Sequence, residues 1–160
     1  MPKETRLNTI EHTIVINRPI EDVFRFVHDP KNDPSWQTTL IECQQVEEGP
    51  VGVGTQLRER RRFLGIQVEM TREITEYEPS TSSAFKYVAG GAPMSGEYRL
   101  ERLDGGTRLT AIGYVESRGF FKWAEPLFIS MAGRELQASR GHLKDLLEVG
   151  RGQILLEELQ

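Results

Sequence analysis

Two consecutive segments of the sequence place charged residues among apolar ones on one alternating face. In residues 55–64, every second position is taken by Leu57, Glu59, Arg61 and Phe63. In residues 66–78, the corresponding positions are Val68, Met70 and Arg72. Because successive side chains of a strand point to opposite faces, both sets predict neighbouring strands with one carboxylate and two guanidinium groups facing inward.

Buried charges of this kind have a limited choice of partners. Burying a carboxylate or a guanidinium without a counter-charge is costly, so Glu59, Arg61 and Arg72 are expected to pair with each other, with Glu135 or with a ligand. One hypothesis is that Arg61 or Arg72 binds an acidic or carbonyl oxygen, while Glu59 orients the ligand or takes a proton. The alternative is an internal salt bridge or an ion pair at a cavity mouth.

The tyrosines, the histidines and the single cysteine are less specific candidates for a chemical role. Tyr87 and Tyr98 lie in later strands, where a hydroxyl either donates to a carbonyl or enolate oxygen or caps an apolar wall. His12 lies on the apolar face of the first strand, as a core histidine or a general base. The three histidines are far apart and Cys43 is the single cysteine, so the sequence predicts neither a metal site nor a cofactor.

These side chains must be positioned by a long helix predicted over residues 120–149. Its apolar stripe carries Phe128 and large residues at both ends but thins to Ala132 and Ser139 in the middle, with Glu135 at the edge. Small residues there fit either one wall of a cavity or tight packing against a sheet. Arg134, Gln137, Arg140, Lys144 and Glu148 are predicted to point away from the stripe. Pro126 predicts a kink or a late helix start.

The rest of the chain reads mainly as strands. Residues 9–16 alternate as a strand, residues 19–28 have helical spacing after Pro19, and residues 33–36 predict one more turn that carries Trp36 inward. Six strands follow between turn residues at about 40–47, 55–64, 66–78, 83–89, 96–103 and 107–116. The short connections predict an antiparallel meander.

Composition restricts the class of protein. The 160 residues with 38% hydrophobic content fit a single domain, and the net charge of −4 argues against a nucleic-acid partner. The lone cysteine and the lack of an apolar leader or membrane span predict a cytoplasmic protein. The apolar residues of the tail, 151–160, are expected to dock on their own domain or on a second copy in a homodimer.

Six short motifs occur in order over residues 9–149. They are Ile16–Phe24, Asp29-Pro30 with Pro34-Ser35-Trp36, Gly52–Thr55, Ile74–Pro79, Gly106–Thr110 and His142–Glu148. In this order the chain resembles the SRPBCC (START/Bet v 1-like) superfamily, and within it the polyketide cyclase/dehydrase-like group. The resemblance implies an α+β helix-grip fold: a seven-stranded antiparallel sheet wrapped around a long C-terminal helix, with two short helices after the first strand. It also implies an interior cavity for a hydrophobic or amphipathic small molecule, but no single chemistry.

We therefore expect one helix-grip domain over residues 1–150, followed by the tail. Its function is expected to be binding of an aromatic, polyketide-like or lipid-like molecule. The alternatives are an enzyme of cyclase or dehydratase type, and a protein-interaction module that uses the long helix and the tail. The residues expected to line the cavity are Trp36, Leu57, Glu59, Arg61, Val68, Met70, Arg72, Tyr87, Tyr98, Phe121, Phe128, Met131, Ala132 and Glu135.

Overall fold

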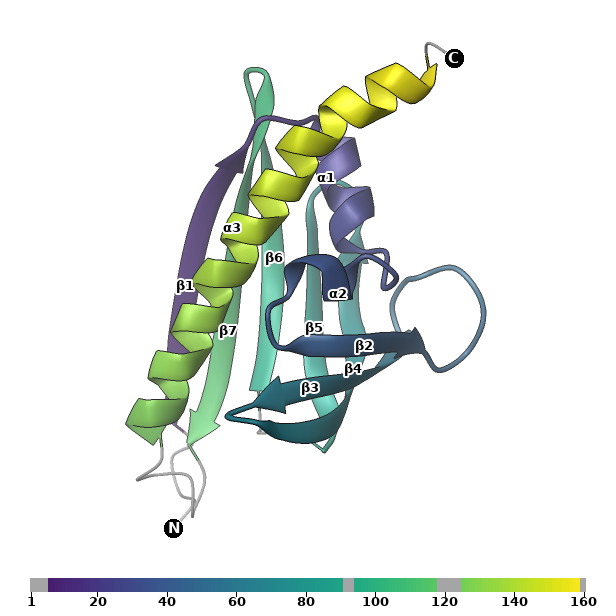
Figure 1. Ribbon diagram of the computed structural model, residues 1–160. Helices are drawn as coiled ribbons and strands as arrows, with labels where there is room; N and C mark the ends of the chain where they lie inside the picture. The colour runs from purple at the N-terminus through teal and green to yellow at the C-terminus, as the bar shows by residue number, and fades with distance from the viewer. Residues whose placement is uncertain (1–5, 91–93, 118–124, 159–160) are drawn as a thin grey trace.

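The computed structural model describes residues 6–90, 94–117 and 125–158 (Figure 1). The elements are, in chain order, β1 (Arg6–Ile16), α1 (Ile20–Val27), α2 (Asp33–Trp36), β2 (Leu40–Gln45), β3 (Gln56–Phe63), β4 (Ile66–Glu78), β5 (Ser82–Ala89), β6 (Met94–Leu103), β7 (Gly106–Ser117) and α3 (Glu125–Glu158). The expected element order is therefore confirmed.

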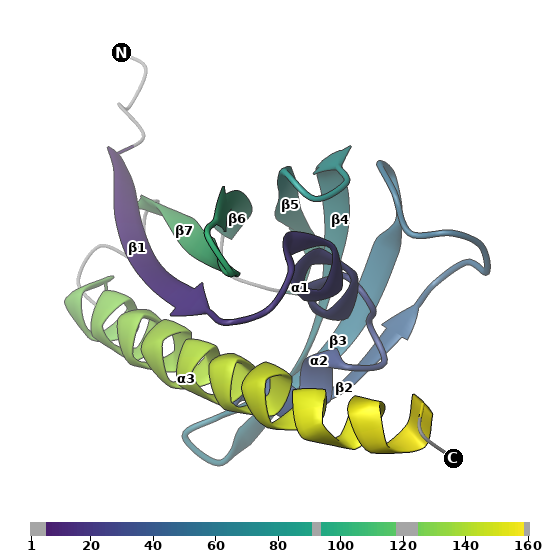
Figure 2. The ribbon, with the colours of Figure 1, turned by 90° about the horizontal axis from the view of Figure 1, so that it is seen from above.

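The strands form one antiparallel sheet in the order β1-β7-β6-β5-β4-β3-β2. Seen from above, the sheet curves around α3, which crosses its open side between β1 and β2 (Figure 2). This is the helix-grip arrangement, and the predicted fold class is confirmed. The concave face of the sheet and the inner face of α3 therefore enclose the interior of the domain.

The β3–β4 hairpin fixes which charged side chains face that interior. Its turn residues Leu64 and Gly65 both have positive φ, 49° and 80°, as a tight two-residue hairpin turn requires. The resulting register pairs Leu57 with Arg72 and Arg61 with Val68. The predicted inward face of β3 is confirmed, because Leu57, Glu59 and Arg61 are buried.

The two short helices close one end of the domain. Glu21 and Asp22 lie in the first turn of α1, where their negative charges stabilise the positive end of the helix dipole. The apolar face of α1 is buried. Pro34 lies in the first turn of α2, a position where proline costs no hydrogen bond. Trp36 is 1% exposed and packs in the core with α1, β7 and α3.

Helix α3 begins later and ends later than its apolar pattern predicts. Pro126 is its second residue, which agrees with the expected late start because the first turn needs no N–H donor there. The helix continues through Gly150 to Glu158 and extends beyond the sheet (Figure 1). Gly150 and Gly152 each weaken a helix by roughly 1 kcal/mol, and the helix nevertheless continues over residues 151–158. Among the described residues, none of the helices combines the length and the hydrophobicity that a membrane span needs.

Candidate functional site

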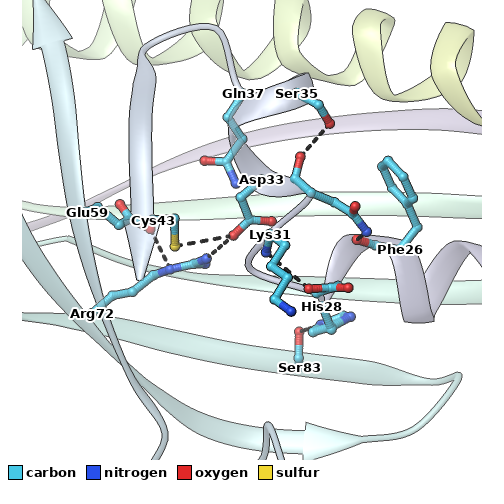
Figure 3. A network of polar contacts seen from close by, with 12 residues as sticks. Phe26, His28, Lys31, Asp33, Ser35, Gln37, Cys43, Glu59, Arg72 and Ser83 are labelled. Carbon is cyan, nitrogen blue, oxygen red and sulfur yellow. Dashed lines mark hydrogen bonds and ion pairs between the residues drawn. The ribbon is translucent and has the colours of Figure 1, made fainter. Parts of the chain in front are cut away.

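Arg72 of β4 lies between two buried carboxylates (Figure 3). Its Nε is 2.6 Å from Glu59 Oε1, and its Nη2 donates to Asp33 Oδ2 at 2.8 Å. Glu59 comes from β3, whereas Asp33 is the first residue of α2. The pairing therefore joins the sheet to the short helix that follows α1.

Arg61 extends the same network toward α3. Its Nε donates to Glu59 Oε2 at 2.8 Å, and its Nη2 donates to Gln37 Oε1 at 2.5 Å. Its Nη1 donates to Thr39 Oγ1 at 2.9 Å and lies 3.5 Å from Glu135 Oε1. The guanidinium thus connects β3, the segment after α2 and the helix α3.

Glu59 is the centre of this network and has no free oxygen. It is 0% exposed. Its Oε1 pairs with Arg72, and its Oε2 accepts from Arg61 and, at 3.0 Å, from the Tyr87 hydroxyl. Burial alone raises the pKa of a carboxyl, but the guanidinium groups of Arg72 and Arg61 hold the pKa of Glu59 below its usual value. Burial raises the pKa of Tyr87, so its hydroxyl keeps its proton. Glu59 is therefore an ionised structural partner of the arginines.

Asp33 is the less strongly stabilised of the two carboxylates. It is 1% exposed, and its Oδ1 has no hydrogen-bond partner within the described chain. Burial raises its pKa to about 7, although the charge of Arg72 acts in the opposite direction. The thiol of Cys43 lies 3.8 Å from Asp33 Oδ2, and burial raises the pKa of that thiol to about 12. The Cys43 thiol therefore keeps its proton at neutral pH.

A cavity of about 410 Å³ lies between the concave face of the sheet and α3. This volume is within the range of small-molecule sites, roughly 300–1,000 Å³. Its apolar wall consists of Phe63, Val68, Met70, Phe85, Met94, Phe128, Met131, Ala132 and Leu136. Its polar wall consists of Gln37, Thr39, Arg61, Arg72, Tyr87, Tyr98, Glu135, Ser139 and Arg140. An apolar chamber with polar groups of this kind suits an amphipathic ligand.

The structure places most of the predicted lining residues on this wall. They are Arg61, Val68, Met70, Arg72, Tyr87, Tyr98, Phe128, Met131, Ala132 and Glu135. Trp36 and Leu57 are instead buried outside the cavity wall, Trp36 on α2 and Leu57 near the start of β3. Glu59 lies behind the two arginines that cover it. Phe121 is outside the described residues.

Several residues of the site were not predicted from the sequence. They include the wall residues Gln37, Thr39, Phe85 and Met94 and the charged residues Asp33 and Arg140. Asp33 was interpreted only as part of a turn, although a buried Arg72 requires an acidic partner from outside its own strand. Arg140 was predicted to point away from the interior, and this is wrong, because it is 2% exposed and lines the cavity. Its position between Leu136 and Leu143, at helical spacings of four and three, was the available signal.

His12 and His28 do not line this cavity. His28 stacks on Phe24 with ring centroids 4.0 Å apart, and it contacts Ser83 Oγ at 2.6 Å and Phe24 O at 2.7 Å. Burial lowers its pKa to about 4, so the ring is neutral at neutral pH. His12 is half-buried, and its Nδ1 has no hydrogen-bond partner among the described residues. Within those residues, no three His, Cys, Asp or Glu side chains are grouped to hold a metal ion.

Solved structures share this fold over most of the chain. The aromatase/cyclase Zhui from Streptomyces sp. R1128 has 20% identity and a TM-score of 0.73, over 89% of this chain and 94% of the other. A START superfamily protein from Mycobacterium smegmatis has 17% identity and a TM-score of 0.73, over 88% and 97%. The Aha1 dimer from Colwellia psychrerythraea has 16% identity and a TM-score of 0.64, over 89% and 98%. At these identities the likeness shows the fold alone.

The family of the chain follows from its sequence. No curated protein matches it. The family described as polyketide cyclase/dehydrase and lipid transport matches residues 8–148, which include β3, β4 and the cavity-lining part of α3. The chain therefore belongs to the polyketide cyclase/dehydrase and lipid transport family, within the SRPBCC superfamily that its motifs resemble.

Proposed function

We propose that this protein binds a hydrophobic or amphipathic small molecule of aromatic, polyketide-like or lipid-like chemistry in the cavity under α3. The observation that carries the proposal is the cavity of about 410 Å³ with a largely apolar wall. Packed domains leave few voids larger than a water molecule. A chamber of this size, walled by aromatic and methionine side chains, therefore supports a binding role.

The test compares two tryptophan substitutions on the same helix. Ala132 lines the cavity, whereas Ala138 is exposed on the other side of α3. Ala132→Trp places an indole ring inside the chamber, and Ala138→Trp adds the same side chain to the surface. Isothermal titration calorimetry with fatty acids and polycyclic aromatic acids should detect binding to the wild type and to Ala138→Trp, and none to Ala132→Trp.

Thermal unfolding provides an independent readout of the same comparison. A ligand at 100 times its Kd stabilises the folded state by about 2.7 kcal/mol, which raises the Tm of any variant that binds it. The wild type and Ala138→Trp should show this rise. Equal stabilisation of Ala132→Trp, or no binding by any compound in the panel, would contradict the proposal.

A second candidate function is catalysis of the cyclase or dehydratase type, which the donors of the polar wall favour. Arg61, Arg72, Tyr87 and Tyr98 line the same chamber as the carboxylate of Glu135. Donors of this kind stabilise negative charge on a carbonyl oxygen, and a carboxylate in contact with the ligand exchanges protons. Glu59 is poorly suited to that role because both of its oxygens are paired.

Catalysis has a separate test. A poly-β-ketone chain incubated with the wild type should lose water or close a ring, as detected by mass spectrometry. Glu135→Gln should lower the rate by roughly 100-fold or more while the chain still binds. Binding of the chain without any conversion would leave only the binding function.

A further inference from the structure

Among the described residues, Arg140 is the one buried arginine that has no acidic partner. It lies on α3, is 2% exposed and lines the cavity. Arg61 and Arg72 pair with Glu59, and Arg18 pairs with Asp22 at 3.0 Å. Within the described parts of the chain, no carboxylate pairs with Arg140, and its buried Nε has no hydrogen-bond partner.

Among the described residues, Arg140 contacts two aromatic rings, and its buried Nε donates to none of those residues. Its Cζ lies 5.2 Å from the ring centroid of Trp36 and 5.1 Å from that of Tyr98. Such cation–π contacts engage the flat faces of a guanidinium. The donors are arranged around its edge and still require acceptors, because a buried charge with unsatisfied donors is costly.

We infer that Arg140 binds the carboxylate group of the ligand, so that the cavity selects amphipathic acids over neutral molecules of the same shape. This inference rests on the proposed binding function and specifies its ligand. The guanidinium edge matches a carboxylate with two parallel hydrogen bonds. A single unpaired cation balances a single negative charge, which favours a carboxylate over a phosphate dianion.

The remaining charged groups of the wall support this assignment. Arg61 and Arg72 are already neutralised by Glu59 and Asp33. Glu135 accepts from Thr39 and lies near Arg61, and its negative charge disfavours an anion at that position. Arg140 is therefore the cation of the described wall that is left to bind an acid.

The apolar wall has room for the rest of such a molecule. Phe128 precedes Arg140 by 12 residues of α3, which is about 18 Å along the helix axis. Met131, Ala132 and Leu136 line the cavity between them. A carboxylate at Arg140 therefore leaves a ring system or an acyl chain to extend along α3 toward Phe128.

The experiment compares acids with their amides, which have nearly the same shape but no charge. Isothermal titration calorimetry at pH 7.5 would use 2-naphthoate with 2-naphthamide, and decanoate with decanamide. The wild type should bind each acid about 10- to 100-fold more tightly than its amide, the ratio given by a charge-assisted hydrogen bond. Arg140→Gln should remove this preference while the affinity for the amides stays within about twofold.

Two further variants control for folding and for charge. Arg140→Met removes the charge but keeps a flexible apolar stem between the rings, a replacement that often preserves stability, and it should give the same result as Arg140→Gln. Arg134 is exposed on α3, so Arg134→Gln makes the same change in net charge outside the cavity and should keep the wild-type preference.

The outcomes separate this inference from the function on which it rests. Equal affinity of the wild type for acid and amide, or an unchanged preference in both Arg140 variants, would overturn the role of Arg140 and leave binding in the cavity intact. Failure of every probe to bind the wild type would contradict the proposed function and, with it, this inference.

Discussion

Arg72 Nε lies 2.6 Å from Oε1 of Glu59, across the β3–β4 pair, and both side chains are nearly excluded from solvent. The register pairs Arg72 with Leu57, so Glu59 is its diagonal neighbour on the same face of the sheet. Arg72 lines the cavity and also contacts Asp33 of α2, so the pair lies between the cavity and the end of the domain that α1 and α2 close. Substitutions in it are therefore expected to affect stability before they affect binding.

Glu59→Gln should destabilise the protein by about 3–5 kcal/mol, because it removes the shared counter-charge of two buried arginines. Urea denaturation at neutral pH measures this free energy of unfolding. Glu42→Gln is the matched control, since Glu42 pairs with Arg60 at 2.8 Å while 42% of its side chain is exposed. That change should cost less than about 1 kcal/mol, and equal losses in the two variants would contradict a central role for Glu59.

Tyr87→Phe removes a hydroxyl that donates to the charged Glu59. The free energy of unfolding should fall by roughly 1.5–3 kcal/mol, the usual contribution of a hydrogen bond to a charged group. Tyr114→Phe removes a hydroxyl that donates to Glu97 at 3.3 Å in a more exposed position on β7, and it should cost about 1 kcal/mol or less. A larger loss for Tyr114→Phe would argue against the geometry described for Tyr87.

His28 should make the protein less stable in mild acid. Burial lowers its pKa in the folded state to about 4, whereas the unfolded chain titrates near 6.5. Between these values the unfolded state binds more protons, so stability falls as pH decreases from about 6.5 to 4, by about 3 kcal/mol.

Urea titrations at a series of pH values test the contribution of His28. His28→Gln should flatten the loss between pH 6.5 and 4. His142→Gln replaces an exposed histidine of α3 and should leave the wild-type dependence in place. The same slope in His28→Gln as in the wild type would show that other groups cause it.

Asp33 should contribute a slope of opposite sign. Burial raises its folded-state pKa to about 7, above the value of about 3.9 in an unfolded chain. The folded state therefore binds more protons between these values, and this contribution to stability decreases as pH rises from about 4 to 7. The free energy of unfolding of the wild type minus that of Asp33→Asn should fall across this window, and a constant or rising difference would contradict the raised pKa.

The sequence predicted those parts of the site that depend on local periodicity. Alternation alone places Glu59, Arg61 and Arg72 on the inner face, because a strand has a fixed period of two. The orientation of Tyr87 on β5 was not predictable in this way. The β4–β5 pairing shifts register twice, between Thr71 and Arg72 and between Ile74 and Glu76, and a sequence pattern carries no sign of such shifts.

The remaining residues of the site depend on long-range contacts. Asp33 reaches Arg72 from 39 residues away, and only the folded chain brings α2 next to β4. Arg140 was assigned to the surface because a helical pattern based on hydrophobicity treats a charge as solvent-exposed. Its burial depends on the rings of Trp36 and Tyr98, which come from α2 and β6.

The central claim is that the interior of this domain holds a small molecule, and native mass spectrometry of the full chain as purified from cells tests it most directly. We predict a bound molecule at one per chain, with an apolar body and a carboxylate, that is present on Ala138→Trp and absent from Ala132→Trp. A chain of unmodified mass that also gains no thermal stability from the acid panel would contradict the claim and favour a protein-interaction role for α3.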